Sequence, residues 1–171
     1  QSAPYTPNQN PTEHYIDILV SGTRSLLYTS GLPHDIFWPH ALLHRTYLQN
    51  IMALPGRCTP YELLTGQQPN LSYLRIFGCE VLAYIEKQKR TKFDPKAERC
   101  IYLGPSPTHS VDTYKLWHLE KGTIIFRRNV VFNEAVFPGK NMDIKMWQNN
   151  QQDTGATSLD LISLTTARDS Q

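Results

Sequence analysis

Four basic side chains lie close together near the middle of the sequence. The segment 86–92 reads EKQKRTK and contains four cations within six residues, namely Lys87, Lys89, Arg90 and Lys92. Each cation can neutralise a phosphate, which gives salt-dependent attraction to nucleic acid without sequence preference. Arg127 and Arg128 would extend this patch if the fold brings them alongside. The alternative is a solvated loop with ordinary surface charges.

The charge balance places the basic excess in the same region. The whole chain has a formal net charge of only +2. Between Arg75 and Arg128, eleven Lys or Arg stand against six Asp or Glu, so this stretch carries +5 and the remainder carries −3. Nucleic acid is the partner class that such a basic stretch indicates.

One carboxylate near the N-terminus could take part in metal chemistry. Glu13 follows Asn10 by three positions, with Pro11 between them, which is typical of a capped helix start. Two divalent cations that hold the oxygens of a phosphodiester in line need several converging carboxylates. Asp17 could share a face with Glu13, but two acids on one helix leave the opposite side of the metals open. We therefore favour the capping role for Glu13 over a metal role.

Histidine and cysteine spacing does not predict a metal site. His40 and His44 are four residues apart, a spacing that can place two imidazoles on one metal. No third ligand is near and the HExxH carboxylate is missing, so packed or helix-surface histidines are favoured. Cys58, Cys79 and Cys100 are too far apart for a CxxC knuckle and are expected to be reduced thiols.

Helical patterns occupy the first 65 residues. Apolar positions recur with the spacing of one buried helical face at Tyr15, Ile18, Leu19, Gly22 and Leu26. Caps and breakers complete the pattern. We expect helices in three places: after the loop 1–10 as far as Gly31, from near Asp35 to about Met52, and from the Thr59 cap to about Leu64.

Strand patterns follow, separated by turn residues. Glu120, Lys121 and Gly122 form a compact hairpin turn, with glycine available for positive φ. Four or five short strands with tight connections predict a small barrel or sandwich. The expected strand regions are Ile76 to Ile85, Arg99 to Leu103, Thr113 to Leu119 and Thr123 to Phe132.

Composition predicts a globular body with a disordered tail. The chain has 171 residues, of which 40% are apolar, and this is enough for a modest core. From Lys140 onward, Asn, Gln, Ser, Thr and Asp dominate, so little apolar surface is available to offset chain entropy. No apolar run approaches the roughly 20 residues of a membrane span. We expect an intracellular chain, with the nucleus as a candidate compartment.

The stretch 66–79, GQQPNLSYLRIFGC, resembles a junction in copia-type LTR-retrotransposon polyproteins. There, GxxPNLSxLRxFGC links the integrase catalytic core to an SH3-like barrel. The resemblance runs from Ser2 to about Glu134, and includes SAPYTPNQN at the start and KFDPKA at 92–97. It implies an α+β chain in three parts: a helical remnant of a ribonuclease-H-like integrase core over 1–65, a small SH3-like β-barrel over 66–136, and a disordered tail over 137–171.

The same resemblance implies an incomplete active site. With a one-residue gap, Glu13 aligns with the third carboxylate of the family's D, D, E set, and two of the three carboxylates are then lacking here. The chain alone is therefore not expected to be an enzyme or to hold a cofactor, although the intact integrase would use Mg²⁺ or Mn²⁺ as a polynucleotidyl transferase. Family positions that carry DNA-facing basic side chains read His14, Ile16 and Asp17, which weakens the attraction to phosphate.

Two functions remain open at this stage. The first is a fragment of a retrotransposon integrase that acts in DNA integration, by weak contact with DNA or by contact with integrase subunits or other element proteins. The alternative is a protein-interaction module of a domesticated or decayed transposon gene, in which the helices dock on a partner. Neither function involves a membrane.

Overall fold

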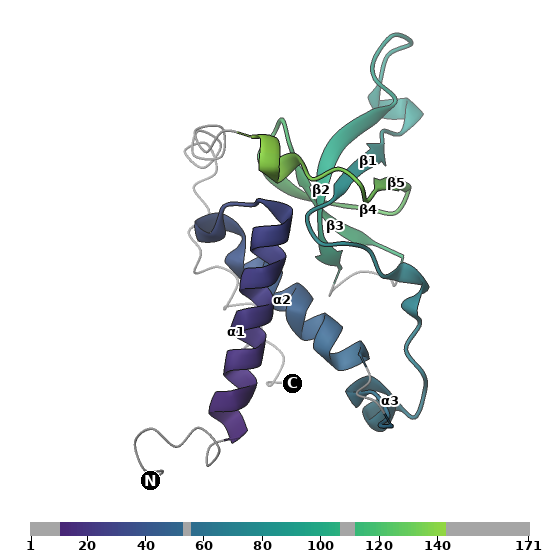
Figure 1. The fold of residues 1–171 in the computed structure, drawn as a ribbon. Coiled ribbons are helices and arrows are strands. Elements are labelled where there is room, and N and C mark those ends of the chain that lie inside the picture. The colour runs from purple at the N-terminus through teal and green to yellow at the C-terminus, as the bar shows by residue number, and fades with distance from the viewer. Residues whose placement is uncertain (1–10, 53–55, 107–111, 143–171) are drawn as a thin grey trace, which may run out of the picture.

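The computed structural model describes residues 11–52, 56–106 and 112–142. Helices come first and an antiparallel sheet follows, as predicted (Figure 1). The main elements are α1 (Pro11–Ser30), α2 (His34–Ile51), α3 (Pro60–Thr65), β1 (Glu80–Tyr84), β2 (Ala97–Pro105), β3 (Tyr114–His118), β4 (Thr123–Arg127) and β5 (Val130–Asn133). Short 3₁₀ turns η2 (Leu71–Tyr73), η3 (Lys87–Lys89) and η4 (Pro138–Asn141) lie between or after them.

The five strands form one sheet in the order β4-β3-β2-β1-β5, with every neighbouring pair antiparallel. The stretch expected from Thr123 to Phe132 forms two strands, because the chain leaves β4 after Arg127 and returns as β5. Arg127 pairs with Tyr114 of β3, whereas Val130 pairs with Ala83 of β1. The break lets β4 and β5 form the two opposite edges of the same sheet.

The central strand β2 is buried on both of its faces. Cys100 and Tyr102 belong to a cluster inside the curved sheet, together with Val81 and Leu116. The intervening Ile101 and Leu103 point to the other side, where they join a second cluster with residues of the helices. Successive side chains of a strand alternate between faces, so one strand serves both clusters.

The helices and the sheet share the second cluster. Leu27 of α1 and Phe37 and Ala41 of α2 pack with Ile101 and Trp117 of the sheet. The rings of Phe37 and Trp117 meet edge to face, with centroids 5.1 Å apart. Figure 1 shows α1 and α2 side by side next to β2 and β3.

Only the C-terminal half of α1 is buried. The helix begins at Pro11 as predicted, although the proposed cap Asn10 lies outside the described residues. Tyr15 was expected on the buried face, but it is 44% exposed because α2 covers only the later turns. At Gly22 the helices approach so closely that an added Cβ would overlap the Arg45 side chain of α2.

The α3 helix has the caps that its sequence predicts. Thr59 Oγ1 accepts a hydrogen bond from the Glu62 amide at 3.0 Å, and Pro60 occupies the first helical position. Gly66 ends the helix with φ of 70°, a left-handed conformation that glycine adopts without steric cost.

The first part of the predicted tail is folded. Pro138 and Gly139 of η4 are buried, and an added Cβ at Gly139 would lie 2.7 Å from the Ser30 carbonyl oxygen at the end of α1. Met142 packs against the helix–sheet cluster. The remainder of the predicted tail, residues 143–171, lies outside the described residues.

Candidate nucleic-acid interface

The predicted basic segment forms the connection between β1 and β2. This loop, residues 85–96, projects beyond the strands and away from the helices (Figure 1). Lys87 and Lys92 are exposed, and within the described residues neither of them has an ion-pair partner. Lys89 is the last residue of η3, and its side chain lies outside the described parts of the chain. The loop therefore presents these two cations to solvent.

Arg90 is held against the body of the sheet. Its guanidinium lies 5.7 Å from the centre of the Tyr84 ring, and Nη2 donates a hydrogen bond of 3.3 Å to the Tyr84 hydroxyl. A second local contact shapes the same loop, because the Thr91 amide donates to Asp94 Oδ2 at 2.7 Å. This hydrogen bond holds the pKa of Asp94 below its usual value. The Asp94 carboxylate thus stabilises the turn between Thr91 and Asp94.

Phe93 is the most exposed large apolar side chain of the loop. It is 94% exposed, directly after Lys92. Phe93 lies in the connection and not in a strand, whereas Tyr102 of β2 is buried in the core. An exposed ring beside cations is the combination that stacks on unpaired bases while the charges contact phosphates.

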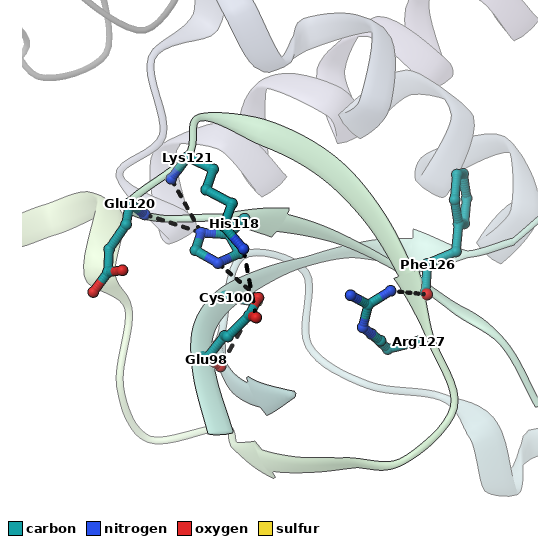
Figure 2. A network of polar contacts seen from close by, with 7 residues as sticks. All are labelled: Glu98, Cys100, His118, Glu120, Lys121, Phe126 and Arg127. Atoms are coloured by element: carbon teal, nitrogen blue, oxygen red, sulfur yellow. Dashed lines mark hydrogen bonds and ion pairs between the residues drawn. The ribbon is translucent and has the colours of Figure 1, made fainter. Parts of the chain in front are cut away.

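Arg127 and Arg128 approach the same end of β1. The Tyr84 amide donates to the carbonyl of Asn129 at 3.0 Å, which places the β4–β5 connection beside the start of the basic loop. The two guanidinium groups are engaged locally, however. Arg127 Nη1 donates to the Phe126 carbonyl at 3.1 Å (Figure 2), and Arg128 Nε donates to Thr113 Oγ1 at 3.3 Å.

A polar network around the buried His118, unforeseen from the sequence, fixes the β3–β4 hairpin (Figure 2). His118 Nδ1 accepts hydrogen bonds from the amides of Glu120 and Lys121 at 3.2 and 3.1 Å. Since Nδ1 accepts, the proton of the neutral ring is on Nε2, which lies 2.7 Å from Glu98 Oε2. Glu98 also lies 3.5 Å from Lys121 Nζ. The Glu98 carboxylate is thus paired within the protein, and the contacts of His118 hold the β3–β4 turn in place.

Glu13 lies in the first turn of α1 and is exposed, as is Asp17 one turn later. Among the described residues, no group of three or more His, Cys, Asp or Glu side chains is arranged to hold a metal ion. The structure therefore leaves Glu13 without converging carboxylates from the described part of the chain, and it is not brought near the basic loop.

His40 and His44 are buried where α2 meets the sheet. His40 Nδ1 lies 3.1 Å from Lys115 Nζ of β3. The pKa of each imidazole is lowered to about 4, by burial in both cases and, for His40, also by the charge of Lys115. An ammonium group at this distance disfavours a metal cation on His40.

Comparisons with known proteins agree with this architecture. Residues 79–145 match the family model described as the retroviral polymerase SH3-like domain. The chain is 32% identical over 143 residues to the retrovirus-related Pol polyprotein from transposon RE1 of Arabidopsis thaliana, which covers 82% of this chain and 10% of that protein. It is 32% identical over 138 residues to the corresponding polyprotein from transposon TNT 1-94 of Nicotiana tabacum, which covers 79% of this chain and 10% of that protein.

The matches concern a short part of each relative. The chain spans about a tenth of the length of these curated polyproteins. No solved structure matches it. In the part of the chain that the structure describes, no helix is long and apolar enough to cross a membrane. The chain is a segment of a retrotransposon Pol polyprotein, and it carries a retroviral polymerase SH3-like domain at residues 79–145.

Proposed function

We propose that this segment comes from the integrase of a copia-type element, and that its β1–β2 loop contacts the DNA backbone during integration. The observation that carries the proposal is the exposure of Lys87, Lys92 and Phe93 on a loop that projects from the sheet. The helices before the sheet would then be the last helices of a ribonuclease-H-like core, as the resemblance implies.

The loop chemistry suits sequence-independent binding. Lys87 and Lys92 supply mobile point charges for phosphates, whereas Arg90 is oriented by Tyr84. Asp94 accepts the Thr91 amide, which directs its carboxylate into the turn. Phe93 adds a stacking face where a strand is unpaired. These roles give weak binding whose strength depends on salt.

Under this proposal the segment alone has no strand-transfer activity. The residues present do not fit a pair of divalent metals, because Glu13 and Asp17 are exposed on a single helix, and the described residues bring no third acid to them. Glu13 would act only when the rest of an integrase core supplies the other carboxylates.

A salt series with a charge-matched control tests the proposed interface. DNA binding by the K87Q/K92Q variant is compared with binding by R24Q/R57Q, which removes two exposed cations elsewhere. The slope of log K against log salt should become shallower by about 2 in the loop variant, because each neutralised phosphate contributes roughly −0.9 to that slope. Equal weakening in both variants, or binding that ignores salt, would refute the loop as the interface.

A protein-interaction role is the second candidate, and one observation favours it. The N-terminal half of α1 leaves Tyr15, Ile16 and Val20 exposed, and α3 leaves Leu63 and Leu64 exposed. Apolar side chains at such density mark surfaces that bind proteins. Light scattering of the purified chain distinguishes the two candidates, because an oligomer that does not retain DNA would support protein interaction.

A further inference from the structure

A cavity of about 490 Å³ lies between α2, the segment around η2, and strands β2 and β3. Its volume is within the range of small-molecule sites. Most of its lining is apolar or aromatic and includes Leu43, Tyr47, Tyr61, Tyr73, Leu103 and Tyr114. The proposed DNA-contacting loop does not contribute to it.

A buried cation faces this cavity. Lys115 of β3 is only 9% exposed, because it lies on the side of the strand that faces α2. Its Nζ is 3.1 Å from His40 Nδ1, a neutral partner that offsets no charge. No acidic side chain is among the described residues that line the cavity. Asp112 is exposed and accepts a hydrogen bond from Tyr73 in the lining.

An uncompensated ammonium group is costly in such a place. Taking a charge out of water costs several kcal/mol unless a counter-charge or several hydrogen bonds replace the solvent. Burial lowers the pKa of Lys115, which is the direction expected when no carboxylate lies beside the ammonium. The described residues therefore provide a positive group at the cavity and no negative group in its lining that would balance it.

His44 provides a second unsatisfied polar group in the same lining. It is only 2% exposed, and within the described residues its Nδ1 has no hydrogen-bond partner. A Cβ placed on Gly104 would lie 3.1 Å from that nitrogen, and Gly104 is the strand partner of Lys115. Gly104 lies beside the His44 ring and pairs with Lys115, so the imidazole and the ammonium group line the same part of the cavity.

We propose that this cavity binds a small ligand in which an aromatic ring carries one anionic group, with a size up to that of a mononucleotide. The anion would contact Lys115 and His44, and the ring would pack among the tyrosines and leucines. A nucleotide and an aromatic carboxylate share this chemistry. The inference goes beyond the proposed DNA contact and does not depend on it.

Calorimetric titration of the full chain tests the ligand class with four probes. They are dAMP, 4-hydroxybenzoate, deoxyadenosine, which lacks the anion, and inorganic phosphate, which lacks the ring. At least one of the first two should bind at one site, and about tenfold more tightly than deoxyadenosine and phosphate. Which of the two binds identifies the source of the anion. The proposal fails if neither of the first two probes saturates, or if the one that binds does so no more tightly than deoxyadenosine and phosphate.

Two variants test the position of the site. Lys115→Met keeps the apolar stem and removes the charge, and should weaken binding by roughly tenfold or more. Leu43→Glu changes an exposed position of the lining, so the fold is retained while the new carboxylate repels the anion. Leu63→Glu adds the same charge at an exposed position outside the lining and should leave binding unchanged. Wild-type affinity in L43E would overturn the proposal.

Discussion

The two faces of strands β2 and β3 are equally buried but differ in chemistry. The cluster inside the curved sheet contains thiols, aliphatic chains and tyrosine rings such as Cys100, Leu116 and Tyr102. The face toward the helices adds three ionisable groups, His40, His44 and Lys115, to its apolar contacts. On the first face, the buried His118 is paired with Glu98 and with the amides of the hairpin, so its polar atoms have partners within the fold. The face toward the helices carries polar groups that lower the stability of the fold but that a binding site can use.

Neighbouring residues of β3 allow the difference to be measured. Leu116 is fully buried on the inner face, so Leu116→Ala should lower the free energy of unfolding by about 2–5 kcal/mol, because transfer free energy is forfeited and a cavity is left behind. Denaturant titration followed by circular dichroism measures the change. A decrease of less than about 1 kcal/mol would mean that the inner face is loosely packed.

Acidification should destabilise the face toward the helices. The pKa of His40 and of His44 is lowered by burial to about 4, so between pH 6.5 and 4 the unfolded state binds more protons than the folded state. Stability should fall by roughly 2–3 kcal/mol per histidine as the pH drops through this window. Denaturant titrations at several pH values measure the loss.

Substitution of a buried imidazole supplies the control for this pH dependence. His44→Gln should flatten the profile, whatever its effect on stability at pH 7. The pKa of Asp94 is lowered as well, but its contribution is lost only below the histidine window. A profile that stays flat from pH 7 to 5 contradicts the burial of neutral imidazoles.

Lys115→Met should have a much smaller effect on stability than Leu116→Ala, although the two residues are adjacent and both buried. Replacing a buried ammonium by an apolar chain of similar length removes the desolvation cost, so stability should be unchanged or rise by about 1 kcal/mol. The melting temperature reports the result. A drop as large as that of L116A would show that Lys115 stabilises the fold.

Thiol reactivity gives the smallest and most local readout. Burial raises the pKa of Cys79 and of Cys100 to about 12, so both thiols on the inner face should be inert at neutral pH. Cys58 is exposed between α2 and α3 and should react. A chromogenic disulfide reagent should therefore label one thiol in the folded chain and three after denaturation. Fast labelling of a second thiol would show that the sheet opens.

Local signals in the sequence predicted the local structure. The Thr59 cap, the Gly66 terminator and the Gly122 turn each lie where their residue chemistry requires. The break between β4 and β5 was missed because Arg128 and Asn129 carry no glycine or proline signal, and the break depends on distant pairing partners. The exposed half of α1 was missed because periodicity shows which face is apolar but not what covers it.

The candidate sites were predicted to different extents. The basic loop was visible because its cations are contiguous in sequence. The cavity was not visible, since His40 and Lys115 lie 75 residues apart and meet only when α2 packs on the sheet. The metal hypothesis for His40 and His44 rested on their spacing along one helix. The sequence did not show that the ammonium group of Lys115 lies beside His40, where it disfavours a metal cation. Sequence reasoning finds sites made of adjacent residues more readily than sites made by tertiary packing.

The two-sided burial of β2 bears on how such domains spread among mobile elements. The matched family unit begins at Cys79, after both long helices, yet Ile101, Leu103 and Trp117 are covered by side chains of those helices. An excised five-stranded sheet would expose these apolar side chains and tend to aggregate. A rearrangement that moved residues 79–145 into another polyprotein would therefore need to carry α1 and α2 along, or to provide another cover for this face.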